Sequence, residues 1–364
     1  MERNLTVTRV LRWVISGLPA MAWLLFVFGY SLLGMRPLVI LTPQHGRVGN
    51  RLTLFAHVVA CAMANDLRVI NTALAEYASL FEMASNDPFV RFPPRSSRLA
   101  ALLRYPLLER LIRTVVHDSA SIASMIVLHL RTERVKTLVL GYDLLDLGSP
   151  GFLSVLQRSR VVFLRGYRYR DPGSLSRHSD RIRTLLKPVA RTEAAIDRIL
   201  GAARAPGSVL VGVHVRQTDV GAAEERIARY SLKTYGTSVE IKTAFALDEF
   251  VGVMRRLVAL LAGRAVVFVV TSDVRLQPSD FPGLTVVLGS GDVGEDLYLL
   301  ARCDYIVGPG STYSGWAAFH GKVPLYWMTA RDVDPSAISL EEFRVPHQWT
   351  GFEVRMPDGS WFIY

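Results

Sequence analysis

Three side chains that could do chemistry close an apolar stretch of the chain. Residues 209–215 have the β-branched pattern of a buried strand, and His214, Arg216 and Asp219 fall at or just beyond its carboxyl end. Open α/β sheets bind ligands at the carboxyl ends of their strands. A planar guanidinium there could hold two oxygens of a diphosphate and neutralise it as it leaves. The alternative is an Arg216–Asp219 ion pair that only pins the turn.

A glycine-rich turn is the second candidate. Residues 45–51 (HGRVGNR) follow an apolar strand and open an amphipathic helix. Glycines let the backbone approach a ligand, and the N–H groups of a helix N-terminus attract phosphate. The run is neither a Walker A loop nor the Gly-x-Gly-x-x-Gly dinucleotide turn. A turn that needs glycine but binds nothing remains the alternative.

The third candidate lies further along the chain. Residues 294–304 (GEDLYLLARCD), 305–307 (YIV) and 308–316 (GPGSTYSGW) read as a helix, a strand and a turn that opens another helix. Such a turn offers amides and hydroxyls suited to phosphate. Ser311 could equally serve only as an N-cap.

Strands and helices alternate around these candidates. Short β-branched runs between longer runs of helical spacing predict an α/β protein with parallel sheets and crossover helices. The expected strands are Leu38–Leu41, Leu67–Ile70, Thr137–Leu140, Val161–Leu164, Val209–Val215, Val266–Thr271, Leu284–Leu288, Tyr305–Val307 and Leu325–Trp327. The expected helices are Asn50–Ala64, Leu99–Val115, Ser119–Thr132, Phe245–Leu261, Asp296–Cys303 and Thr312–Phe319.

A Pro/Gly stretch at 202–207 (AARAPG) has linker composition and separates two Rossmann-like domains. The expected parts are a tail and membrane anchor at 1–36, an N-terminal domain at 37–205, a C-terminal domain at 206–335 and a final segment at 336–364. That aromatic final segment either crosses back onto the first domain or closes an acceptor site.

An uncharged run near the N-terminus, Trp13–Gly34, predicts one transmembrane span. Its 22 residues would extend about 33 Å as a helix, against a bilayer core of about 30 Å. Arginines lie on both sides, so the positive-inside rule sets no clear orientation. The alternatives are a buried or interfacial helix, or a true start at Met35. We expect a membrane-associated protein whose catalytic domain faces the cytoplasm.

Composition excludes several protein classes. With 364 residues, 50% of them hydrophobic, the chain is neither disordered, collagen-like nor a small disulfide scaffold. The net charge of +10 comes mostly from arginine, which suits an anionic partner, although a GC-rich genome explains it as well. Cys61 and Cys303 match neither a zinc nor a redox spacing, so buried thiols in a reducing compartment and no structural metal are expected.

Two further patterns in the sequence predict no site of their own. Residues 158–183 are rich in arginine with tyrosines between, but no nucleic-acid motif accompanies them. A cleft wall or a solvated, lipid-facing helix is favoured, and no nucleic-acid partner is expected. The triplet Asp332-Val333-Asp334 fits an Asp-x-Asp metal motif, but it follows the last strand and is interpreted as a loop.

Taken together, the three candidate segments resemble the inverting fucosyltransferases of the α-1,2, α-1,6 and protein O-fucosyltransferase superfamily. Residues 214–219 (HVRQTD) are similar to its His-x-Arg signature, and residues 46–50 (GRVGN) to the Gly-Arg-Phe-Gly-Asn loop of the O-fucosyl branch. Residues 161–172, with a helix around Ser174–Leu186, resemble the strand and helix leading into the second domain. The matches run in the family's order from about residue 38 to residue 328.

The resemblance implies a GT-B architecture of two facing Rossmann-like domains, here preceded by one hydrophobic helix. It also implies a GDP-fucose donor bound mainly by the C-terminal domain, and no metal. Arg216 would hold the β-phosphate and stabilise the leaving group. The other implied donor-binding residues are His214 and Asp296 at the guanine end, Ser311 and Thr312 at the phosphates, Asp273 with no part of the donor specified, and Gly46, Arg47, Gly49 and Asn50 from the N-terminal domain.

Three acidic residues are candidates for the catalytic base. In the α-1,6 branch a glutamate lies ten residues after the signature histidine, and Glu224 occupies that position here. Glu225 and Asp219 are rivals, and Glu224 on a solvated helix face is the alternative. Two departures from that branch are Val220, where it has lysine, and Val274, where it has a second acid after Asp273.

The sequence therefore predicts a membrane-associated glycosyltransferase. It would move fucose from GDP-fucose to a glycan hydroxyl with inversion, during assembly of a surface glycan. The alternative, motivated by Val220 and Val274, is a non-catalytic GDP-sugar-binding or scaffold protein at the membrane.

Overall fold

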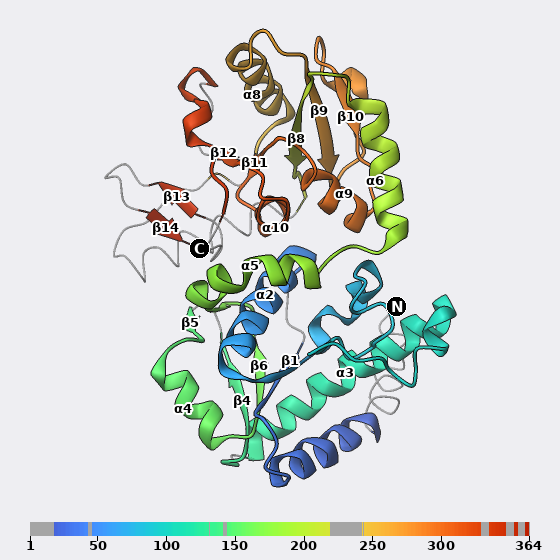
Figure 1. Cartoon of the computed structure of the whole chain (residues 1–364), viewed down its shortest axis with the longest axis vertical. Helices are drawn as coiled ribbons and strands as arrows, with labels where there is room; N and C mark the ends of the chain where they lie inside the picture. The colour runs from blue at the N-terminus through green and yellow to red at the C-terminus, as the bar shows by residue number, and fades with distance from the viewer. Residues whose placement is uncertain are drawn as a thin grey trace, which may run out of the picture. The chain divides into compact units, whose positions relative to one another are not determined.

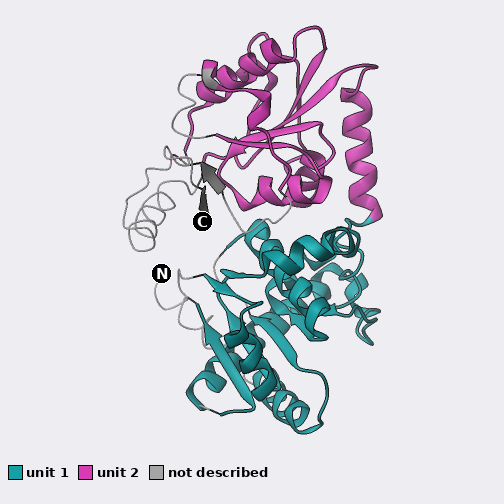
Figure 2. Cartoon of the chain, turned by 60° about the vertical axis from the view of Figure 1, so that its left-hand side comes forward, with its two compact units in different colours: residues 1–189 teal, residues 190–364 magenta. Residues whose placement is uncertain are grey.

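The computed structural model describes residues 18–42, 46–130, 132–140, 144–218, 242, 244–328, 335–346, 353–355 and 361–363. The chain divides into two compact units, Met1–Val189 and Ala190–Tyr364 (Figure 2). The division falls before helix α6 (Ala190–Ala203), which the sequence had placed in the first domain. Helix α6 belongs to the second unit because it packs on α9 (Val293–Leu300).

Unit 1 contains a five-stranded sheet in the order β3-β2-β1-β6-β4. All neighbours run parallel except β3, which pairs antiparallel with β2. The central strands are buried and almost wholly apolar, as expected where helices cover both faces of a parallel sheet. The strands are β1 (Leu38–Thr42), β2 (Arg68–Asn71), β3 (Arg91–Phe92), β4 (Val135–Val139) and β6 (Val161–Arg165), with β5 (Leu145–Asp146) and β7 (Tyr169–Arg170) forming a separate pair.

Six labelled helices accompany this sheet among the described residues. They are α2 (Val48–Asn65), η1 (Thr72–Leu80), η2 (Leu102–Arg104), α3 (Pro106–Leu130), α4 (Pro150–Arg158) and α5 (Pro172–Leu185). Figure 1 shows α2 and α5 running side by side, and these two helices are in contact.

Helix α3 corrects the prediction of two separate helices, Leu99–Val115 and Ser119–Thr132. It is a single helix from Pro106 to Leu130. No glycine or proline interrupts the sequence after Pro106, so the backbone has no reason to break near His117. The stretch before Pro106 forms only the short 3₁₀ turn η2.

Within the described residues, the N-terminal helix covers Leu18–Leu32 and is apolar. Among the described residues, α3 alone is long and apolar enough to cross a bilayer, and part of its surface is buried within unit 1. The N-terminal helix also contributes to the core of unit 1, where Trp23, Val27 and Tyr30 are buried beside residues of β1 and α3. The predicted transmembrane span remains a prediction.

Unit 2 contains a fully parallel sheet in the order β10-β9-β8-β11-β12. Its strands coincide closely with the predicted ones: β8 (Val209–Val215), β9 (Val266–Ser272), β10 (Val286–Leu288), β11 (Tyr305–Pro309) and β12 (Leu325–Met328). The main helices are α6, α8 (Leu247–Leu260), α9 and α10 (Thr312–Gly321).

Helix α8 closes one face of the unit 2 sheet. Its Phe250, Val253, Met254 and Leu257 join the apolar side chains of β8 and β9 in one buried cluster. Ile338 and Phe343, from the beginning of the final segment, belong to the same cluster. The described residues 335–346 therefore pack within unit 2. Beyond them, β13 (Glu353–Arg355) and β14 (Trp361–Ile363) form an antiparallel pair.

Cys61 and Cys303 are both free and buried, as the sequence predicted. Burial raises the pKa of the Cys61 thiol to about 12, with the nearby Asp171 carboxylate acting in the same direction. Burial likewise raises the pKa of Cys303. Both thiols therefore stay protonated near neutral pH and have little nucleophilic character.

Candidate functional site

The order of strands in unit 2 creates a natural place for a ligand. From β8 the chain proceeds to β9 and β10 on one side, then crosses to β11 and β12 on the other. The loops that leave the carboxyl ends of β8 and β11 therefore run in opposite directions. Open α/β sheets bind their ligands in the crevice between two such loops. His214 and Arg216 lie at the end of β8, and the turn into α10 follows β11.

His214 is buried at this end of the sheet, with 7% of its surface exposed. Its ring lies 5.0 Å from the Tyr313 ring, centroid to centroid. Burial, assisted by the positive charge of Arg216, lowers the pKa of His214 to about 4, so the ring is neutral at pH 7. Its Nδ1 atom has no hydrogen-bond partner within the part of the chain that the structure describes. A buried polar atom of this kind is available to a ligand.

Asp273 holds the turn that carries Arg216. Its carboxylate follows β9 and accepts hydrogen bonds from the backbone N–H of Gln217 at 2.8 Å and of Thr218 at 3.3 Å. It also accepts one from the Thr218 hydroxyl. Partial burial raises the pKa of Asp273, but these donors outweigh that effect and leave it lower than usual. Asp273, predicted as donor-binding, therefore braces the backbone just beyond half-buried Arg216.

Asp296 lies in the first turn of α9 and faces the turn after β10. Its Oδ1 accepts a hydrogen bond from the Ser290 backbone N–H at 2.9 Å. A Cβ atom at Gly289 would stand 2.4 Å from that oxygen, so only glycine fits there. Gly291 has a φ of +80°, which also favours glycine. Burial raises the pKa of Asp296 to about 6, even though backbone N–H groups of Ser290 and Gly291 stabilise the carboxylate.

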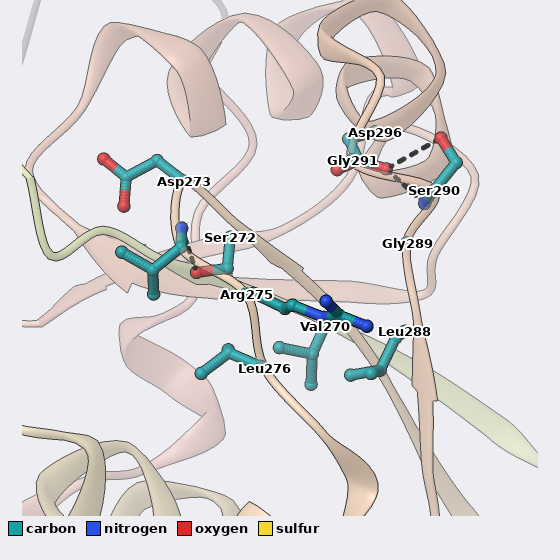
Figure 3. A pocket seen from close by; sticks show the side chains of 11 residues that line it. Val270, Ser272, Asp273, Arg275, Leu276, Leu288, Gly289, Ser290, Gly291 and Asp296 are labelled. Atoms are coloured by element: carbon teal, nitrogen blue, oxygen red, sulfur yellow. Dashed lines mark hydrogen bonds between the residues drawn. The ribbon is translucent and has the colours of Figure 1, made fainter.

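A cavity of about 350 Å³ opens between these two aspartates (Figure 3). That volume lies within the usual range for small-ligand pockets. Figure 3 shows Asp296 and Ser290 at one side, Asp273 at the other, and Arg275 reaching across toward Val270 and Leu288. The lining combines apolar walls with carboxylates and a guanidinium; it consists of Val270, Ser272, Asp273, Val274, Arg275, Leu276, Leu288, Gly289, Ser290, Gly291 and Asp296.

Sequence analysis missed Arg275 and residues 289–291 in this lining. The available signal was the Gly-Ser-Gly turn directly after an expected strand, which is the position where open α/β sheets place ligand-binding loops. Val274, one of the departures from the α-1,6 branch, also lines the cavity, and its backbone N–H donates to the Ser272 hydroxyl at 3.1 Å.

The carboxyl end of β11 is tightly packed against β8. A Cβ at Gly308 would lie 3.0 Å from both the Cβ and the carbonyl oxygen of His214. Ser311 is the N-cap of α10, and its hydroxyl accepts from the Tyr313 backbone N–H at 3.2 Å. Ser311 is thus an N-cap, and its predicted contact with phosphate stays a prediction. Thr312, predicted to contact phosphate, is the first residue of the helix and half-buried.

In unit 1, the glycine-rich turn opens α2 at the carboxyl end of β1. Gly46 has a φ of +130°, and a Cβ there would lie 2.8 Å from the Nδ2 atom of Asn50, so glycine is required. Arg51 supports the turn because its Nε donates to the Gly46 carbonyl at 3.0 Å. Arg47 is exposed at the N-cap position, and Gly49 is buried in the first turn of α2.

Arg51 was missed by sequence analysis as a positioning residue. Its Nη1 donates to the Ala73 carbonyl at 2.7 Å and lies 2.6 Å from a Glu76 carboxylate oxygen. The guanidinium also stands over the Tyr77 ring. These contacts tie the turn to η1 and leave the neighbouring Arg47 side chain exposed.

The arginine-rich stretch 158–183 is partly internal. Arg168 and Arg170 have only 1% and 3% of their surface exposed. Burial, together with the neighbouring charge of Arg168, lowers the pKa of Arg170 to about 9. Arg165 donates to the hydroxyls of Ser121 and Ser124 on α3. These three arginines therefore serve the packing of unit 1 instead of lining a cleft or facing solvent.

Several predicted residues lie outside the described ranges. They are the acids proposed as base, Asp219, Glu224 and Glu225, together with Val220 and the Asp332–Asp334 triplet. Among the residues that the structure does describe, no group of three or more His, Cys, Asp or Glu side chains is arranged to hold a metal ion.

Solved structures with a similar fold exist, although the sequences differ. No protein-family model matches the chain, and no curated protein sequence is similar enough to count as a relative. A structure of POFUT1 in complex with GDP-fucose matches with a TM-score of 0.50 at 13% identity, over 78% of this chain and 94% of that one. This likeness confirms the α/β fold and, at the level of fold, the resemblance to fucosyltransferases.

Two other solved structures are similar at lower scores. A mutant of Arabidopsis thaliana FUT1 in complex with GDP matches with a TM-score of 0.46 at 12% identity, over 90% of this chain and 77% of that one. Fucosyltransferase NodZ from Bradyrhizobium matches with a TM-score of 0.45 at 14% identity, over 82% of this chain and 96% of that one.

Proposed function

We propose that the protein is a glycosyltransferase that moves fucose from GDP-fucose to a glycan hydroxyl with inversion and without a metal, during synthesis of a surface glycan. The observation that carries the proposal is a cavity at the carboxyl edge of the unit 2 sheet, lined by two aspartates, of which Asp273 also accepts a hydrogen bond from the turn directly after Arg216. The fold likeness to POFUT1, whose structure holds GDP-fucose, supports the same donor.

The cavity has the chemistry that guanine requires. Guanine carries two adjacent donors, N1–H and N2–H₂, which a carboxylate can accept together, whereas adenine lacks the exocyclic donor at that position. Asp296 lines the cavity and is ionised above its pKa of about 6. Val270 and Leu288 offer apolar surface for the faces of the base, and Arg275 can stack on it.

Arg216 supplies the charge that the reaction needs. As the glycosidic bond to fucose breaks, negative charge develops on the β-phosphate, and a fixed guanidinium stabilises that charge without reorganising. Asp273 accepts from the backbone N–H groups of residues 217 and 218, and so fixes the turn that follows Arg216 before the donor binds. Amides at the N-terminus of α10 offer further donors to phosphate.

A single displacement also requires a base on the acceptor hydroxyl. Glu224 is our first candidate, with Asp219 and Glu225 as rivals. Transfer should be lost in Glu224→Gln and retained in Glu225→Gln at unchanged affinity for GDP. The reverse pattern would reassign the base to Glu225. If both variants retain transfer, neither glutamate is the base.

Donor binding is tested by thermal shift and calorimetry on the full chain in EDTA, with GDP, GDP-fucose, GDP-mannose and UDP-sugars. A ligand that binds only the folded state raises the melting temperature with its occupancy. Stabilisation by GDP and GDP-fucose is the expected result. The proposal is contradicted if no guanine nucleotide raises the melting temperature. It is also contradicted if only UDP-sugars raise it, and only when metal is added.

Catalysis is tested separately with Arg216→Lys, which keeps the charge but loses the planar fork. The rate of fucose transfer, to acceptor glycans or to water, should fall by at least about 100-fold, as it does when other donors that stabilise developing charge are removed. The melting temperature should stay unchanged. Normal turnover in this variant would refute the assigned role. Wild-type protein that binds GDP but shows neither transfer nor hydrolysis would instead favour the non-catalytic binding protein.

A further inference from the structure

The N-terminal helix, Leu18–Leu32, has one face built into unit 1. Trp23, Val27 and Tyr30 have at most 7% of their surface exposed and join the cluster formed by β1, β2 and α3. The Trp23 ring meets the Phe89 ring edge-on at 6.0 Å. The Tyr30 hydroxyl donates to the Arg36 carbonyl at 2.7 Å. This helix is therefore part of the folded domain.

The opposite face of the same helix is exposed and wholly apolar. Leu18, Leu25 and Leu32, spaced seven residues apart, expose 83%, 72% and 72% of their surfaces. A spacing of seven residues returns to the same side of a helix. Met21, Phe26 and Leu33 are also exposed, and the segment 18–35 contains no charged residue. A contiguous apolar face of this kind marks an interaction surface.

Arginines gather at the carboxyl end of this helix. Arg134 donates to the Ser31 carbonyl at 3.4 Å, and Nη1 of Arg68 lies 3.9 Å from the Met35 sulfur. Arg36, Arg68 and Arg95 all act electrostatically on the Tyr30 hydroxyl. Asp66 is paired with Arg36 at 2.9 Å. Even with that acid counted, the surroundings of this end of the helix carry a net positive charge.

We propose that this face docks on an anionic lipid bilayer, with the helix lying in the plane of the membrane surface. Leu18, Leu25 and Leu32 would enter the acyl boundary, and the arginines would meet lipid phosphates, as amphipathic interfacial helices do. The helix cannot cross the bilayer without pulling Trp23, Val27 and Tyr30 out of the core of unit 1.

The first experiment measures binding of the full chain to vesicles of phosphatidylcholine, with or without one-third phosphatidylglycerol. Binding should require phosphatidylglycerol and weaken at high salt. Leu25→Glu should reduce the partition coefficient at least about tenfold, whereas the matched exposed substitution Val258→Glu on α8 should not change it. Arg134→Gln should reduce it about fivefold, with Arg255→Gln as its control.

The second experiment measures depth. Single cysteines at Leu18, Leu25 and Leu32 carry an environment-sensitive fluorophore, and lipid-bound quenchers report how deep each label lies. The native thiols Cys61 and Cys303 are buried and stay unlabelled. A helix in the membrane plane places all three labels at one shallow depth. A transmembrane helix separates neighbouring labels by about 10 Å.

Three results would overturn the proposal: labels at graded depths, binding that ignores both Leu25→Glu and lipid charge, or no binding at all. If the chain stays off vesicles but sediments as a dimer that Leu25→Glu dissociates, the face is instead an interface between two copies. Circular dichroism of each variant separates loss of docking from loss of folding.

Discussion

The raised pKa of Asp296 predicts how the stability of unit 2 depends on pH. Folding keeps this carboxyl protonated up to about pH 6, whereas its ordinary pKa is 3.8. Between these values the folded chain binds more protons than the unfolded chain, so the contribution of Asp296 to stability falls as pH rises. The substitution Asp296→Asn removes that dependence. The variant should therefore gain stability relative to wild type as pH increases from about 4 to about 6, and no further above it.

The size of the gain follows from the shift. A difference of about two pKa units corresponds to about 3 kcal/mol, because each unit is worth about 1.4 kcal/mol. His214 titrates in the same window with the opposite sign, since its pKa is lowered to about 4. That contribution is present in both proteins and cancels in the difference. Altered hydrogen bonds to Ser290 add an offset that does not depend on pH.

Urea unfolding of wild type and Asp296→Asn at several pH values measures this difference. Tryptophan fluorescence is a suitable signal because Trp316 is fully buried in the same unit. The free energy of unfolding of the variant, minus that of wild type, should rise by about 3 kcal/mol across the window. A difference that stays flat within about 0.5 kcal/mol, or that falls with pH, would show that the buried carboxyl carries no raised pKa.

Three further predictions concern the same edge of the sheet. If guanine donates to ionised Asp296, affinity for GDP should fall up to about tenfold per pH unit below pH 6; calorimetry should find that dependence lost in Asp296→Asn. Asp273→Ala should lower affinity for GDP about tenfold or more by freeing the turn beyond β8, and the exposed Asp248→Ala should leave that affinity unchanged. Gly308→Ala should destabilise the protein by about 1–3 kcal/mol because its Cβ would crowd His214. In contrast, Gly201→Ala, in open space on α6, should stabilise it by about 0.5–1 kcal/mol; equal melting temperatures for these two variants would refute the packing argument.

Much of the fold could be predicted because the signal is local. Strands β8 (VLVGVHV) and β9 (VVFVVTS) are rich in valine and almost wholly apolar, and such runs mark strands covered on both faces. His214 lies near the carboxyl end of the first of these strands and Arg216 directly follows it. The connection between parallel strands puts their carboxyl ends at one edge of the sheet. The general location of the site was therefore accessible without a structure.

The cavity could not be predicted in the same way. Arg275 and Ser290 belong to different loops, and only the pairing of β10 with β9 brings those loops together. The role of Asp273 also depends on a neighbour, since β8 and β9 must end in register before its carboxylate can reach the backbone of Gln217.

The N-terminal helix shows most clearly which properties the sequence determines and which properties the tertiary structure determines. Its sequence alone determined that residues 18–32 are apolar and helical, because local hydropathy and the absence of charge depend on no other part of the chain. Whether that helix spans, docks or is buried is not a local property. Only the tertiary structure decided that Trp23, Val27 and Tyr30 face the core while Leu18, Leu25 and Leu32 face outward, because burial of one side requires the surfaces of β1 and α3 to be in place.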